Sequence, residues 1–421
     1  MSESQRPLAG VRVADLSRVL AGPYATMLLS DLGAEVVKVE HPERGDDTRA
    51  WGPPWVTPVE DTTSASAESA YYLSVNRGKR SLAVDMKNPD GLAAVQELCA
   101  RSEVVIQNFR PGTAERLGLG YAELSALNPA LVYCSVSGFG PNHQPAGRPG
   151  FDVIVQAESG LMGVTGAPEG EPAKVGVAIT DVLTGLNAAV AILGALMRAQ
   201  ACGTGEHVSA SLINSALSGL VNVTQGALAT NTEPGRYGNA HPAIVPYQAF
   251  PTADGELVIA AGNDALYQRL CAVLKRTDLA TDPRYATNAD RVAHREELVA
   301  ELTSELRRRS ASEWTELLTE SGVPVGHVRG VLEAIRTADA AGDQATMTVD
   351  HPSLGALELL RPGFRLDDAS EQEQPPGAPP PLLGQHSRQI LTELGLAHHR
   401  IEAMFRDGVA HDAGYPPESS R

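Results

Sequence analysis

The stretch VRVADLSRVLAGPYATMLLSDLGAEVVKVE, residues 11–40, decides the fold class. It opens with a short, apolar, β-branched run (11–17) that is typical of a buried strand. A helical stretch (21–33) follows and ends at a glycine, and a second apolar run (35–40) comes next. Two apolar strands joined by a helix predict neighbouring parallel strands.

The same alternation continues through the first third of the chain. A strand is expected at 81–86, a helix that begins at an Asn-Pro pair at 88–89, and further strands within 102–109 and 130–140. Residues 181–201 form a long apolar helix that we expect to be buried. The sequence therefore predicts an α/β protein whose Rossmann-like large domain has a parallel sheet covered by helices.

The sequence changes character near residue 236. A strand is expected at 255–262, followed by charged amphipathic helices through 265–319. We therefore predict a large domain in 1–205, a linker helix in 206–235 and a smaller α+β domain in 236–325. Residues 411–421 are expected to be a disordered tail.

Composition excludes several function classes. The net charge of −17 argues against nucleic acid or an anionic membrane as a partner. No apolar run is expected to span a membrane, and the first residues lack a secretory signal, so we expect a cytoplasmic protein. The 4 cysteines lie far apart and the 11 histidines form no metal-binding motif, so no metal site is predicted.

The turn after the first strand is the natural place for a nucleotide. A dinucleotide-binding fold would carry G-x-G-x-x-G there, but the turn reads SRVLAGPYA and holds only Gly22. This argues against an NAD-dependent oxidoreductase. The free N–H groups at the following helix start can still bind an anion.

Several motifs resemble those of one family. The run LAGPYATMLLSDLGAEVVKVEHPERGDDTR (20–49) is similar to the N-terminal signature of the class III CoA-transferases, the family of formyl-CoA transferase and carnitine CoA-transferase. The resemblance continues, in the right order, through the segments 74–91, 104–121, 135–140, 148–166, 178–185 and 379–387.

The resemblance places the family's catalytic aspartate at Asp181. From the residues alone, an aspartate that begins an apolar helix is most often its N-cap. The two roles are compatible, because a helix N-terminus also keeps a carboxylate ionised. The mechanism implied is covalent catalysis through an aspartyl anhydride and an aspartyl-CoA thioester.

The resemblance also implies where CoA binds as a substrate, with no permanently bound cofactor. Each cation in this set can equally be a surface charge, and Phe109 can be a core aromatic. The expected contacts are the backbone of Val19, Leu20 and Ala21, the side chains of Asn108, Phe109 and Arg116, and either Lys79 or Arg80 on a phosphate.

One position separates two activities within the family. The α-methylacyl-CoA racemases pair the helix aspartate with a histidine in a G-H-D motif. This sequence has Gly150-Phe151-Asp152 instead, and phenylalanine cannot move a proton. Racemisation is disfavoured, while a non-catalytic CoA-binding subunit stays an alternative.

Substrate and assembly follow from the same resemblance. RGDDTRAWGPPWV and SAYYLSVNRGKRS resemble the succinyl-CoA:glutarate CoA-transferase branch, which implies a dicarboxylate acid. Its distal carboxylate needs a cation, for which Arg148, Arg80 and His241 are candidates. The family forms interlocked, ring-shaped homodimers, in which 326–410 would return to the large domain.

Overall fold

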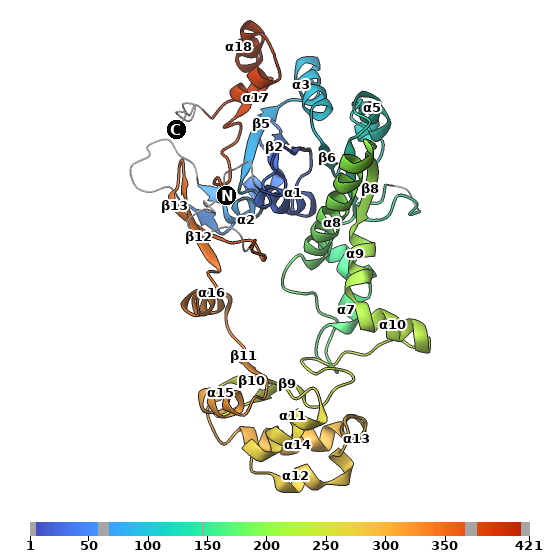
Figure 1. Ribbon diagram of the computed structural model, residues 1–421, viewed down its shortest axis with the longest axis vertical. Helices are drawn as coiled ribbons and strands as arrows, with labels where there is room; N and C mark the ends of the chain where they lie inside the picture. Colours follow the sequence, from blue (N-terminus) through green and yellow to red (C-terminus); the bar gives the residue numbers. More distant parts are fainter. Residues whose placement is uncertain (1–5, 58–66, 145–146, 367–376, 414–421) are drawn as a thin grey trace. The chain divides into compact units, whose positions relative to one another are not determined.

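The computed structural model describes residues 6–57, 67–144, 147–366 and 377–413. The chain divides into two compact units (Figure 1). The first unit comprises 1–161, 175–230 and 344–421, and the second comprises 162–174 and 231–343. The second unit is larger than the small domain expected at 236–325. The tail predicted at 411–421 lies mostly outside the described residues.

A mostly parallel sheet forms the centre of the first unit. Its order is β14-β5-β2-β1-β6-β7-β8, and only β14 runs antiparallel to its neighbour. The strands are β1 (Arg12–Asp15), β2 (Glu35–Glu40), β5 (Lys79–Val84), β6 (Val104–Gln107), β7 (Val132–Ser137), β8 (Glu206–Ser211) and β14 (Ala410–His411). The predicted α/β fold with a parallel sheet is confirmed.

The strand order has a switch point. Counted along the chain, the six parallel strands lie in the order third, second, first, fourth, fifth and sixth, which is the doubly wound arrangement. The order reverses between β1 and β6. Because ligands of such sheets bind outside the carboxyl ends of the strands at this point, the segments after Asp15 and Gln107 are where a ligand is expected.

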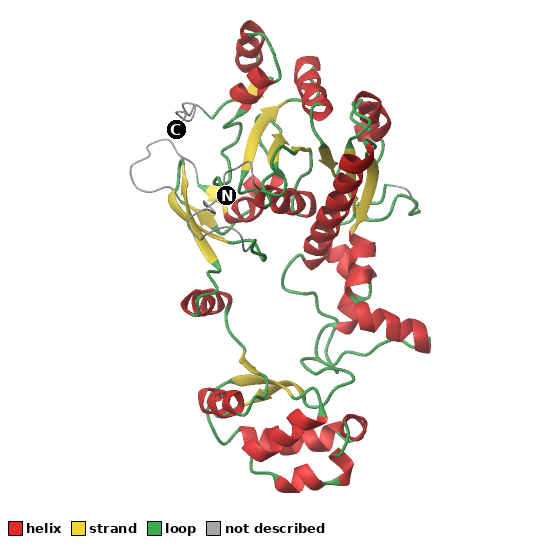
Figure 2. Ribbon diagram, viewed as in Figure 1, coloured by secondary structure: helices red, strands yellow, loops and turns green. Residues whose placement is uncertain are grey.

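Helices cover both faces of this sheet (Figure 2). Side chains alternate between faces along each strand. Val13 and Val36 face α1 (Ala21–Asp31) and α8 (Ile179–Cys202), whereas Ala14 and Val37 face the opposite layer. That layer consists of α3 (Pro89–Ala100), α5 (Tyr121–Leu127), α17 (Ser387–Glu393) and α18 (His398–Arg406).

Helix α8 is buried on one side only. It packs on α1, β7 and β8 through residues such as Ala188 and Ile192, but Val190 and Met197 are exposed on its other side. The expectation that the whole helix is buried is therefore wrong for the single chain. Contrary to the sequence expectation, α8 is the one described helix that is long and apolar enough to cross a membrane, by length and composition only; its buried side packs in the core of the first unit.

The segment expected to be a linker helix is partly sheet. Residues 206–211 form β8, and α9 (Leu212–Gly219) and α10 (Val221–Thr230) follow. The remaining elements of this unit are η2 (Asp47–Ala50), β3 (Trp55–Val56), β4 (Glu68–Ser69), α2 (Ala70–Val75), α4 (Thr113–Arg116), α6 (Asp152–Glu158), β12 (Thr346–His351) and β13 (Gly355–Leu360). The last two pair as an antiparallel hairpin.

The second unit has its own core, around Phe250 and Leu302. An antiparallel sheet, ordered β11-β10-β9, packs with short helices. Its elements are β9 (Tyr247–Pro251), β10 (Glu256–Ala260), α11 (Asp264–Val273), α12 (Thr277–Thr281), η3 (Pro283–Tyr285), α13 (Asn288–Ala293), α14 (Arg295–Leu306), α15 (Ala311–Glu320), β11 (Val325–His327) and α16 (Val331–Ala340). Helix α7 (Leu161–Val164) lies where the first unit passes into the second.

Candidate active site

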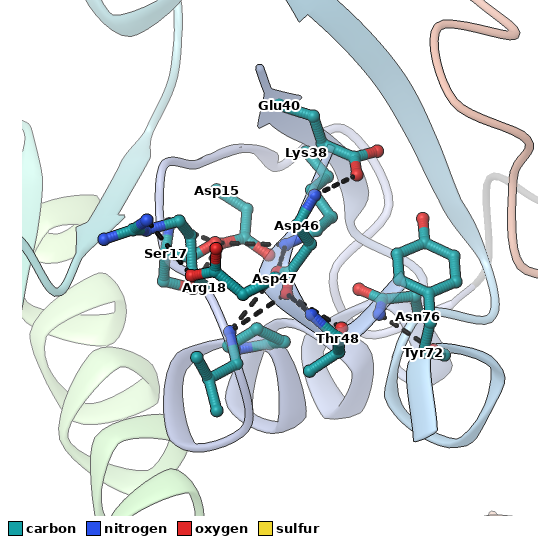
Figure 3. Close-up of polar contacts among 12 residues, drawn as sticks. Asp15, Ser17, Arg18, Lys38, Glu40, Asp46, Asp47, Thr48, Tyr72 and Asn76 are labelled. Carbon is teal, nitrogen blue, oxygen red and sulfur yellow. Dashed lines mark hydrogen bonds and ion pairs between the residues drawn. The ribbon is translucent and has the colours of Figure 1, made fainter. Parts of the chain in front are cut away.

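The turn between β1 and α1 is held from two sides, and Figure 3 shows the side on which Asp46 lies. The side chain of Asn108, which follows β6, accepts from the Arg18 N–H at 3.0 Å and donates to the Arg18 carbonyl at 2.8 Å. On the other side, the Asp46 carboxylate accepts the Val19 N–H at 3.3 Å. Val19 has a φ of 72°, which is unusual for a β-branched residue. The predicted CoA-binding turn therefore lies at the switch point in a fixed conformation.

The single glycine of this turn has a steric role. A Cβ at Gly22 would lie 2.3 Å from the Ser17 hydroxyl oxygen, so only glycine fits there. Ser17 in turn donates from its N–H and its hydroxyl to Asp15. The N–H groups of Leu20 and Ala21 begin α1, where no preceding turn of helix can accept from them, and Leu20 caps the helix without a side-chain bond.

Lys79 is engaged within the fold. Its side chain is fully buried, and its ammonium donates to Asp15 at 3.1 Å, to the Pro23 carbonyl at 2.8 Å and to Asn76 at 3.0 Å. Burial lowers the pKa of Lys79 to about 8, although the carboxylate of Asp15 opposes the shift. All three N–H donors are used inside the protein, which argues against the phosphate contact predicted as one alternative for Lys79.

Arg80 is also engaged within the fold. Its guanidinium donates to both carboxylate oxygens of Glu393, at 2.8 and 2.9 Å, and to Glu35 at 2.5 Å. It therefore ties β5 to α17 and β2. The sequence did not reveal the partners of either cation, because those partners lie far away along the chain.

The other expected CoA contacts divide into two groups. Asn108 has both ends of its amide bonded to Arg18, so it shapes the turn. Phe109 is partly buried against the core beside α5. Arg116 ends α4 and is exposed, and its recorded contact is with Thr113 at 3.0 Å. Arg116 is therefore the predicted cation that stays available for a phosphate.

We expect Arg116 and Arg80 to differ when each is replaced by alanine. Arg116→Ala should raise the KM for acyl-CoA about 10-fold, because a charge-assisted bond to phosphate is lost, while thermal stability stays unchanged. Arg80→Ala should lower the melting temperature and leave that KM unchanged. Steady-state kinetics and thermal melts of both variants test this, and the reverse pattern would contradict the assignment.

Asp181 lies in the first turn of α8 but does not cap it. The N-cap residue is Ala178, which has no side-chain bond, so the N-cap interpretation is wrong. Asp152 of α6 does the capping instead. One of its oxygens accepts from the Thr180 N–H at 2.9 Å and from the Thr180 hydroxyl at 2.8 Å. The other accepts from Gln156 at 2.7 Å, so Asp181 keeps its carboxylate free of this network.

The carboxyl group of Asp181 is harder to ionise than usual. Burial and then the nearby charge of Asp152 raise its pKa to about 7. The expectation that the helix start would lower this pKa is not met in the chain as described. Burial also raises the pKa of the Tyr71 phenol to about 12, and the charges of Asp181, Asp152 and Asp46 add to that shift. Tyr71 is thus a neutral donor within electrostatic range of all three carboxylates.

Apolar contacts join the turn to the start of α8. Leu20 is buried in a small cluster whose partly buried members include Val19, Tyr71, Ala178 and Val182. Nearby, Gly185 allows α8 to approach α1 closely, since a Cβ there would lie 2.7 Å from the Ala21 carbonyl oxygen. The nucleophile candidate and the predicted CoA turn therefore lie side by side.

The two weak candidates for acid binding each have partners of their own. Arg148 is half-buried and forms a two-pronged ion pair with Glu158, while its guanidinium lies 4.6 Å from the centre of the Phe139 ring. His241 belongs to the second unit, where it accepts from the Ala243 N–H at 3.1 Å. A structural ion-pair partner for Arg148 was left open by the sequence, and in the structure that partner is Glu158.

Sequence reasoning missed two residues beside Asp181. Asp152 belongs to the Gly-Phe-Asp motif, from which only Phe151 was interpreted, as evidence against racemisation. Tyr71 stood in a motif that was used only as a family signature. Their link to Asp181 depends on contacts between segments far apart in the chain, which no local pattern reveals.

Comparison with known proteins defines the class. Residues 8–387 match the model of CoA-transferase family III, so the chain belongs to that family and is a CoA-transferase. It is 42% identical to succinyl-CoA:glutarate CoA-transferase from Mus musculus, over 97% of this chain and 91% of that protein. It is 41% identical to succinate–glutarate CoA-transferase from Agrobacterium fabrum, over 94% and 97% respectively. A CAIB/BAIF family protein from Brucella suis has a similar structure, with a TM-score of 0.80 and 39% identity over 92% of this chain and 99% of that one.

Proposed function

We propose that the enzyme moves CoA from succinyl-CoA to a small dicarboxylic acid such as glutarate, with Asp181 as the nucleophile. The observation that carries this proposal is the Asp181 carboxylate at the start of α8, beside the turn at the switch point of a doubly wound sheet. The substrates are suggested by the names of the two relatives described above.

The proposed reaction exchanges acyl groups without external energy. A carboxylate oxygen of Asp181 attacks the thioester carbonyl and the C–S bond breaks. CoA thiolate is released, and a mixed anhydride between Asp181 and the succinyl group remains. The thiolate attacks the aspartyl carbonyl, which releases succinate and leaves an aspartyl-CoA thioester. The acceptor carboxylate attacks that thioester, its C–S bond breaks, and CoA thiolate is released as a second anhydride forms. CoA thiolate then attacks the acceptor's carbonyl and restores Asp181.

The surroundings of Asp181 suit this role. Only the ionised carboxylate is a nucleophile, and a pKa of about 7 leaves it ionised above neutral pH while making it a stronger nucleophile than an ordinary aspartate. The Tyr71 phenol stays protonated and can donate a hydrogen bond to a developing oxyanion. Phe151 is 63% exposed beside Asp152 and has no proton to transfer, which argues against a racemase.

We also propose that the enzyme is a homodimer. The apolar side chains Leu186, Val190, Met197, Leu217 and Val221 are exposed on α8, α9 and α10 of the single chain. Large apolar side chains gathered on consecutive helices and exposed in the single chain are typical of subunit interfaces. A solution mass near that of one chain would contradict the proposal.

A CoA-transfer screen tests the function directly. Succinyl-CoA is the donor, and mono- and dicarboxylic acids are the acceptors. We expect transfer to dicarboxylates and, after hydroxylamine treatment of enzyme incubated with succinyl-CoA, a hydroxamate at Asp181 detected by mass spectrometry. Transfer only to monocarboxylates would contradict the substrate class, and the lack of any adduct or transfer with all acyl-CoA donors would contradict the enzyme assignment.

The pH profile should depend on Asp152. In the wild type, kcat/KM should fall as the pH drops through about 7, because the nucleophile becomes protonated. Asp152→Asn removes the nearby like charge, so the pKa of Asp181 should fall and the acid limb should move to lower pH. Rate profiles from pH 5 to 9 test this, and Glu158→Gln serves as a control on the same helix. An acid limb that stays in place in Asp152→Asn would contradict the coupling.

A further inference from the structure

We propose that Lys38 and Asp46 are positioning residues that hold the β1–α1 turn in the conformation that receives CoA. This inference rests on the proposed function, because it takes CoA to be the ligand of the turn. It assigns a role to two buried charges that the proposed chemistry itself does not use.

The pair is buried away from solvent. The Lys38 ammonium, from β2, lies 2.8 Å from the Asp46 carboxylate, which precedes η2, and both side chains have 0% exposure. Burial alone would raise the pKa of Asp46, but the charge of Lys38 and the hydrogen bonds from Thr48 outweigh it and lower that pKa to about 2. A buried ion pair contributes little net stability compared with apolar residues of similar size. Stability alone is therefore a weak explanation for the pair.

Both members of the pair contact the backbone of the turn (Figure 3). Lys38 donates to the Ser17 carbonyl at 3.0 Å, and both carboxylate oxygens of Asp46 accept the Val19 N–H at 3.3 Å. Asp46 also accepts from the Thr48 N–H and hydroxyl, at 2.9 and 2.8 Å, which fixes its own orientation. The Asp46 carboxylate is thus held in a fixed orientation in which it accepts the N–H of Val19 in the turn.

The conformation of Val19 needs such support. A β-branched residue with φ near +70° is strained and persists only where its surroundings determine it. Asn108 holds Arg18 from one side, and Asp46 holds Val19 from the other. The N–H groups of Leu20 and Ala21 at the start of α1 have no preceding helical turn to accept them, so the held turn keeps them as donors beside the ligand position that the proposed function implies.

Replacing Asp46 by asparagine tests the proposal. This variant keeps the size of the side chain but removes the carboxylate paired with Lys38, which then has only the charges of Asp15 and Glu40 nearby, and it weakens the acceptor for Val19. We expect the Kd for CoA, measured by calorimetry in an Asp181→Ala background, to rise about 10-fold or more. In the active enzyme, the KM for succinyl-CoA should rise similarly, while kcat changes less than about threefold and the KM for the acid is unchanged.

A second buried ion pair gives a matched control. Asp31 and Arg77 lie 2.6 Å apart, are almost as buried, and within the described part of the chain have no hydrogen bond to the turn. Asp31→Asn should lower the melting temperature to a similar extent but leave the Kd for CoA unchanged. An equal loss of CoA affinity in both variants would overturn the proposal, because it would show a general effect of destabilisation.

The double variant Lys38→Met/Asp46→Leu covers the case in which Asp46→Asn does not fold. It removes both charges, so no unpaired charge is buried, and it should fold. It should nevertheless bind CoA about 10-fold or more weakly, since both contacts with the turn are gone. Wild-type affinity in this variant would overturn the proposal. If wild-type enzyme binds CoA but transfers none, the proposed function fails while the positioning role is still tested by binding.

Discussion

Asp181→Asn is expected to abolish CoA transfer while making the folded chain more stable at pH 8. The loss of activity should reach about 10³-fold or more, because covalent catalysis has no substitute for its nucleophile. Single-turnover assays with succinyl-CoA measure it, together with the disappearance of the Asp181 adduct.

The gain in stability follows from the raised pKa of Asp181. Unfolding would let this carboxyl ionise near pH 4, whereas in the folded chain it holds its proton up to about pH 7. Folding stability is therefore lost as the pH rises from 4 to 7, and asparagine removes that cost. The melting temperature of the variant should exceed that of the wild type at pH 8, and the difference should vanish near pH 4. An inactive variant that melts lower at pH 8 would mean that the fold, rather than the nucleophile, had been damaged.

Asp15→Ala should produce the largest loss of stability among the buried polar residues of the first unit. Asp15 accepts from Ser17, from Thr26 at 2.6 Å and from Lys79 at 3.1 Å, with no exposure to solvent. Removing it leaves the Lys79 ammonium buried without its counter-charge, which costs about 3–5 kcal/mol. Urea denaturation, followed by the fluorescence of Trp51 and Trp55 in a Trp314→Phe background, measures the free energy of unfolding of this unit.

An exposed pair provides the comparison for Asp15. Glu97 and Arg101 form an i,i+4 ion pair on α3 with both side chains more than 40% exposed. Glu97→Ala should change the unfolding free energy by less than about 1 kcal/mol. If Asp15→Ala also lowered the unfolding free energy by less than about 1 kcal/mol, water would have to reach Lys79 in the folded chain.

Local patterns in the sequence predicted the sheet and the family correctly. The apolar runs at 11–17 and 35–40 became β1 and β2, because alternate side chains of a doubly covered strand are all buried. The family motifs likewise identified a CoA-transferase, which the comparison confirms. The N-terminal turn was singled out from its sequence, and it lies at the switch point.

The roles of individual charges could not be predicted in the same way. Lys79 and Arg80 are adjacent in sequence, and both looked like phosphate-binding cations. Their partners are Asp15, 64 residues away, and Glu393, 313 residues away. The same holds for Asp152, whose contact with Thr180 spans 28 residues and two helices. Such contacts exist only after the strands have assembled.

The distance between Arg80 and Glu393 has a consequence for synthesis of the chain. Helix α17 and β14 complete the sheet beside β5, yet they leave the ribosome some 313 residues after Arg80. At 5–20 residues per second, this delay is about 15–60 s. During that interval the apolar side chains Leu82 and Val84, which Ile390 and Leu391 later cover, lack their partners. The core of the first unit therefore stays incomplete while the whole second unit is synthesised. This is the period in which chaperones would protect the nascent chain from aggregation.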